Sequence, residues 1–65
     1  MSNEELKRAL FSREPVTHMG TEYAYVSAII YRTCKGKLYI TAELADKNGH
    51  SVTIVHADKV KAVGA

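Results

Sequence analysis

The chain has 65 residues, which is enough for one hydrophobic core and too few for two domains. A hydrophobic fraction of 46% argues against a disordered chain, and a net charge of +2 argues against a densely acidic mimic of DNA while permitting nucleic-acid binding. The single cysteine excludes an internal disulfide bond. We therefore expect one small domain over residues 1–65.

The first residues predict a short helix over residues 2–12. Ser2 and Glu5 have the spacing of a capping box, in which each side chain accepts a hydrogen bond from the other residue's backbone N–H. Leu6, Ala9 and Leu10 form one apolar stripe, and Pro15 disfavours helical geometry just beyond. So short a helix is marginal alone, and we expect it to cover an open end of a β domain.

From Val16 onward the apolar period changes to two, which predicts strands. Turn signals lie at Gly20, at residues 33–36 and at residues 46–49, and residues 57–59 predict a single helical turn. The expected strands are Val16–Met19, Glu22–Arg32, Lys37–Ala45, His50–His56 and Val60–Val63.

Alternation within the strands predicts which side chains face the core. In the strand over residues 37–45 one face carries Leu38, Ile40, Ala42 and Leu44, and the other carries Tyr39, Thr41 and Glu43. In the strand over residues 50–56 we expect Val52 and Ile54 to point inward.

The order and lengths of these elements over residues 16–63 resemble an SH3-like small barrel. The predicted fold is therefore mainly β with one N-terminal helix and five strands, in the order α-β-β-β-β-3₁₀-β. The long strand over residues 22–32 is expected to bend through a bulge and to serve both halves of the barrel. This architecture hosts many unrelated functions, so it does not identify one.

Two further resemblances concern function. A helix before five strands, with His56-Ala57 near the end, resembles the Sm-like RNA-binding proteins of bacteria, although Val55 stands where their ring-forming members have Lys. Residues 27–32, 42–44, 46–49 and 51–53 are similar to short uncharacterised phage and prophage proteins. The first resemblance implies RNA binding near His56, and the second implies a phage or prophage origin.

No set of residues has the spacing of a catalytic or metal site. His18, His50 and His56 lie far apart in sequence and lack a CxxC or HxxxH companion. Cys34 is expected at an exposed hairpin tip with nothing to hold a base beside it. The carboxylates of Glu43, Asp46 and Asp58 have simpler accounts as turn or solvent-facing residues. We expect no enzyme activity, no metal, no cofactor and no small-molecule substrate.

Aromatic and basic residues interleave in a way that indicates binding. Tyr23, Tyr25 and Tyr31 share one parity of the long strand, and Tyr39 faces outward on the next. Arg32, Lys35 and Lys37 cluster at the hairpin tip between these strands. Such a set suits a protein-recognition surface or single-stranded RNA or DNA, and it also suits tyrosines packed against the helix or a second copy.

We favour a non-enzymatic binding or adaptor module that acts through protein–protein contacts or as a homo-oligomer, with nucleic acid as the alternative partner. The polar segment over residues 2–8 is followed by no apolar signal region, and the apolar stretch over residues 23–31 is about half of a membrane-spanning helix. We expect a cytoplasmic protein without membrane attachment.

Overall fold

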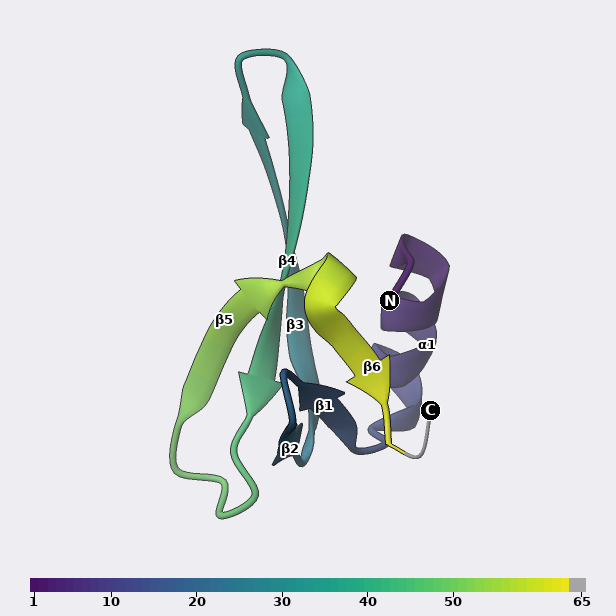
Figure 1. Cartoon of the computed structure of the whole chain (residues 1–65), viewed down its shortest axis with the longest axis vertical. Helices are drawn as coiled ribbons and strands as arrows, with labels where there is room; N and C mark the ends of the chain where they lie inside the picture. The colour runs from purple at the N-terminus through teal and green to yellow at the C-terminus, as the bar shows by residue number, and fades with distance from the viewer. Residues whose placement is uncertain (64–65) are drawn as a thin grey trace.

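The computed structural model describes residues 1–63 and is mainly β with one N-terminal helix, as predicted (Figure 1). The strands of this part of the chain form two antiparallel three-stranded sheets, in the orders β2-β1-β6 and β3-β4-β5. The elements are α1 (Asn3–Ser12), β1 (Val16–His18), β2 (Thr21–Tyr23), β3 (Tyr25–Cys34), β4 (Lys37–Ala45), β5 (Val52–His56), the 3₁₀ helix η1 (Ala57–Lys59) and β6 (Val60–Ala62).

Helix α1 begins with the predicted capping box. The Ser2 backbone N–H donates to the Glu5 carboxylate at 3.0 Å, and the Glu5 N–H donates to the Ser2 hydroxyl at 3.2 Å. The helix ends where Arg13 adopts a left-handed conformation, with its N–H donating to the Ala9 carbonyl. Leu6 and Ala9 are buried, so the apolar stripe packs on the β sheets as expected.

The predicted long strand over residues 22–32 is instead two strands, β2 and β3, separated by Ala24 alone. The Ala24 N–H donates to the Ala45 carbonyl at 2.8 Å, which ties the junction to the end of β4. The stretch therefore contributes to both sheets, as expected. Neither sheet closes on itself within residues 1–63, so the two sheets do not form a closed five-stranded barrel there.

Strand β3 contains the expected bulge, at Ser27. Its register with β4 shifts between Val26 and Ala28, because Ser27 is the extra residue. The Ser27 hydroxyl donates to the Glu43 backbone carbonyl at 3.1 Å and to the Glu43 carboxylate at 2.7 Å. The bulge is thus held by side-chain hydrogen bonds to the neighbouring strand.

The core is small and draws on nearly every element. It consists of buried aliphatic side chains, with Leu6, Val16, Val26, Leu44 and Val60 fully buried. No helix within residues 1–63 has the length and apolar character needed to cross a membrane.

Strand β5 is oriented opposite to the prediction. Val52 and Ile54 were expected inside, but they are 52% and 56% exposed, whereas Val55 is buried. The register explains this, because Ala42 of β4 lies opposite Val55, and directly opposed residues lie on the same face of a sheet. The apolar residues of β5 are therefore divided between the core face and an outer face that carries Val52 and Ile54.

Candidate binding surface

The β3–β4 hairpin extends well beyond the body of the protein (Figure 1). Every residue from Tyr31 to Tyr39 is exposed, and we call this segment the arm. The total accessible surface is 4566 Å², against about 4,100 Å² expected for a compact monomer of 7.2 kDa. The extra surface is consistent with a projecting element of this kind.

Local chemistry accounts for the shape of the arm. Lys35 and Gly36 have φ values of 52° and 79°, the conformation of a two-residue type I′ turn, which matches the twist of the strands on either side. Arg32 lies opposite Tyr39, and Thr33 lies opposite Leu38. Such cross-strand pairs stabilise a ribbon beyond the point where the core supports it.

Five of the seven predicted binding residues lie on the arm. These are Tyr31, Arg32, Lys35, Lys37 and Tyr39. Tyr31 and Tyr39 are 46% and 45% exposed, and Leu38, which the prediction placed on the core face, is 60% exposed because the arm has left the core behind.

Tyr23 and Tyr25 do not belong to this surface. Tyr23 is partly buried against the core. Tyr25 is also partly buried, and the Arg13 guanidinium lies 4.4 Å from the centroid of its ring. Tyr23 therefore packs against the core from β2, and Tyr25 packs beside Arg13 at the start of β3.

The prediction that Tyr25 and Tyr31 share a face is wrong. Tyr25 lies opposite Ala45 and Tyr31 lies opposite Ile40, and these two β4 residues point to opposite faces. The extra residue Ser27 inverts the alternation between the two tyrosines. Tyr39 and Arg32 are therefore on one face of the arm, and Tyr31 and Leu38 are on the other.

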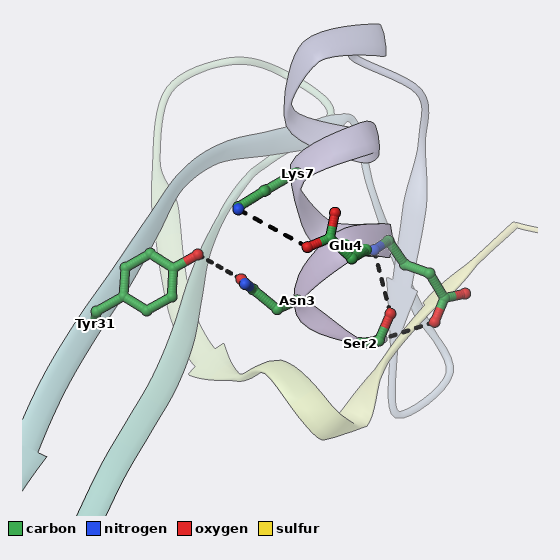
Figure 2. A network of polar contacts seen from close by, with 6 residues as sticks. Ser2, Asn3, Glu4, Lys7 and Tyr31 are labelled. Atoms are coloured by element: carbon green, nitrogen blue, oxygen red, sulfur yellow. Dashed lines mark hydrogen bonds and ion pairs between the residues drawn. The ribbon is translucent and has the colours of Figure 1, made fainter.

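Contacts with the helix fix the base of the arm. The Tyr31 hydroxyl donates to the Asn3 side-chain oxygen, and Asn3 is the first residue of α1 (Figure 2). Beside this contact lies an open groove of about 570 Å³. Its walls are the chain start at Met1–Asn3, the β4 residues Leu38–Ile40 and the segment His56–Lys59. Exposed His56 thus faces the same groove as Tyr39.

The arm is basic throughout. No carboxylate lies in the sequence between Glu22 and Glu43, whereas the arm carries Arg32, Lys35 and Lys37. The ion pairs found within residues 1–63 join Lys7 to Glu4 and Lys47 to Glu22, and none involves these three cations. Their charges are therefore available to a partner.

The candidate reactive groups do not assemble into a site within the described residues. His18 is in β1, His50 is in the exposed 46–51 loop, and Cys34 is exposed beside the turn of the arm. No group of three or more His, Cys, Asp or Glu side chains able to hold a metal ion is found within residues 1–63. Asp46 begins the loop turn, where its carbonyl accepts from the Gly49 N–H at 2.9 Å.

Comparisons with family models, with curated proteins and with solved structures find no match for this chain.

Proposed function

We propose that the chain is a non-enzymatic protein-binding module whose contact surface is the arm. One observation carries the proposal. The arm lies outside the core, and three of its large side chains are close to half exposed or more: Tyr31, Leu38 and Tyr39. Tyr and Arg are among the residue types that dominate the binding energy of protein interfaces. The arm places the two types together, because Arg32 lies opposite Tyr39. Exposed apolar side chains gathered on one element are typical of interaction sites.

Within this proposal we interpret the two open sheets as the halves of an SH3-like small barrel. The passage from β2 to β3 through Ala24 alone supports this, because one stretch of chain then serves both sheets. The resemblance to short phage and prophage proteins leads us to propose a phage or prophage origin and a cytoplasmic location.

Affinity capture with the full chain tests the protein-binding proposal. We expect Leu38→Ser/Tyr39→Ala to lose partners that the wild type retains from a host lysate. Both side chains lie outside the core, so the double variant should lose only about 1 kcal/mol of folding free energy. Met19→Ser is the matched control, because Met19 is 81% exposed and lies in the β1–β2 turn.

The result is read from the two variants together. Capture that survives in Met19→Ser and disappears in the arm variant supports the proposal. Identical partners for all three folded proteins would contradict it. Circular dichroism on each protein confirms that the variants are folded.

The alternative partner is single-stranded RNA or DNA, which the three cations of the arm favour. Arg32, Lys35 and Lys37 would neutralise phosphates, and a base would stack on Tyr39. Three cations are few beside the 6–10 phosphate contacts of strong nucleic-acid binders, and for this reason we place protein binding first.

Titration of labelled single strands against salt distinguishes the two partners. Three phosphate contacts predict a log–log slope of about −2, and Lys35→Asn/Lys37→Gln should reduce it to about −0.7. Absence of binding at low salt would eliminate the nucleic-acid alternative. It would leave the protein-binding proposal unaffected.

A further inference from the structure

Strand β5 is an edge strand with an unpaired side. In the order β3-β4-β5 only β4 pairs with it within residues 1–63, and Figure 1 shows β5 along the left margin of the molecule. An edge strand offers its backbone N–H and C=O groups to another strand. The outer side of β5 is therefore a surface for strand pairing.

The sequence of β5 lacks the features that block such pairing. Folded proteins protect their edges with Lys, Pro or a bulge. The strand Val-Thr-Ile-Val-His has no Lys, Arg, Asp, Glu or Pro, and its register with β4 is regular. By contrast, β2 carries Glu22 and β6 carries Lys61. Of these strands, β5 is the one that a neutral strand can join without burying a charge.

The hydrogen bonds of the adjoining loop show which groups of β5 point outward. The Asp46 N–H donates to the Ser51 carbonyl at 2.9 Å, so the backbone of Ser51 points toward the β4 side. Successive residues of an antiparallel strand point their backbone groups to alternate sides. Val52 and Ile54 therefore present both their N–H and C=O groups at the free edge. His56 presents its N–H there, because its C=O, at the N-cap of η1, already accepts the first hydrogen bond of that helix.

We propose that β5 pairs antiparallel with β5 of a second copy of this chain, with Ile54 opposite Ile54 at the two-fold axis. In this register Val52 lies opposite His56 of the other copy. The two Ile54 residues then exchange both backbone hydrogen bonds, and the His56 N–H of each copy donates to the Val52 carbonyl of the other. The β3-β4-β5 sheet of one copy and that of the other then form one continuous sheet.

The charges are compatible with this two-fold arrangement. The strand has no Lys, Arg, Asp or Glu, so two copies meet without repulsion between such charges. At each end, the 46–51 loop of one copy approaches the η1 segment of the other. Besides His50, the loop carries one carboxylate and one ammonium group, those of Asp46 and Lys47, and η1 carries Asp58 and Lys59. Neither end brings together segments of like net charge.

The contact is small, which sets the expected strength. A five-residue strand pair falls below the area of about 1,600 Å² that a standard stable interface buries. We therefore expect a reversible dimer over a range of about 10 μM to about 1 mM. The arm takes no part, so this inference is independent of the proposed function, and Leu38→Ser/Tyr39→Ala should dimerise like the wild type.

Charge variants at Ile54 test both the pairing and its register. Sedimentation should show the wild type passing from 7.2 kDa toward twice that mass as concentration rises. Ile54→Lys and Ile54→Glu should each dimerise at least about tenfold more weakly, because like charges meet at the axis. An equimolar mixture of the two should associate again. Ile54→Thr, which is neutral and β-branched, is the matched control and should keep dimerising.

Amide hydrogen exchange supplies a second measurement on the wild type. Protection at Ile54 and His56 should rise about tenfold or more across the concentration range, while Thr53 and Val55, bonded to β4 already, change little. A wild type that stays monomeric up to about 1 mM would overturn the proposal. So would a mixture of the two charge variants that fails to associate.

Discussion

At the scale of single residues, the ionisation of Glu5 makes the stability of the helix start depend on pH. The hydrogen bond from the Ser2 backbone N–H, with a further contribution from the Ser2 side chain, holds the pKa of the Glu5 carboxyl below its ordinary value of 4.5. Since the pKa is lower in the folded state, ionised Glu5 stabilises that state above pH 4.5. This stabilisation is lost as the pH falls through the folded-state pKa.

We therefore expect Glu5→Gln to lose less stability on acidification than the wild type does. Gln can still accept from the Ser2 N–H, so the capping box survives at neutral pH. Urea unfolding at about pH 7 and about pH 3 measures the difference. Glu4→Gln removes a charge from the same helical turn without touching the box, and it should behave like the wild type. An unchanged acid dependence in Glu5→Gln would contradict the assignment.

The backbone conformation of Lys35 is the basis of a second prediction at this scale. Its φ of 52° lies in the left-handed region, which Asn adopts more readily than Lys. Lys35→Asn should raise the free energy of unfolding by about 0.5–1 kcal/mol in urea titrations. Lys37→Asn removes the same charge from an extended strand position and should give no such gain. Equal effects of the two substitutions would show that charge, not backbone conformation, is responsible.

At the scale of elements, the bulge in β3 determines which side chains share a face. Ser27→Ala removes the donor to the Glu43 carboxylate and carbonyl in a partly buried position. We expect a loss of about 1–2 kcal/mol in urea unfolding. The control is Ser51→Ala, whose exposed hydroxyl donates to Asp46 at 3.3 Å, and it should lose less. If both variants lost the same amount, the Ser27 bonds would not hold the bulge.

The sequence predicts most elements here but not the faces of two of them. The capping box, a turn within residues 33–36 and the alternation in β4 depend on local chemistry, and all three are confirmed, although the turn is narrower than predicted because β3 extends to Cys34. The inversion between Tyr25 and Tyr31 arises from one extra residue, and nothing in an alternating apolar run marks which residue is extra.

Strand β5 has a related ambiguity. Val52 and Ile54 form the more apolar of its two faces, yet pairing with β4 places Val55 in the core. Tertiary register overrode the local pattern, as is common for short strands near an edge. The candidate site likewise depends partly on local sequence and partly on tertiary structure. The sequence identifies the basic and aromatic residues of the arm, but it does not show that Leu38 and Tyr31 lie beyond the core.

At the scale of the whole molecule, one small aliphatic core joins the helix to both sheets. It contains residues of α1, β1, β3, β4, β5, η1 and β6. Net stabilities of about 0.05–0.15 kcal/mol per residue give about 3–10 kcal/mol for a chain of this size. Because no element has a core of its own, the helix and the sheets should unfold together.

Leu6→Ala tests this coupling. Leu6 is fully buried, so its truncation should cost about 2–5 kcal/mol, a large part of the total. At about 1 kcal/mol per molar urea, the midpoint should fall by about 2 M or more. Phe11→Ala deletes a larger side chain from the same helix, but Phe11 is 84% exposed, and the change should stay within about 0.5 kcal/mol.

The transitions of the helix and the sheets should coincide in both variants. Far-ultraviolet circular dichroism follows the helix, and tyrosine fluorescence follows β2, β3 and β4, which hold all four tyrosines. A helix signal that disappears first in Leu6→Ala, while the tyrosine signal persists, would show that the sheets fold without α1. In that case the Tyr31–Asn3 contact would not be needed to fix the base of the arm, since Asn3 belongs to the helix that had been lost.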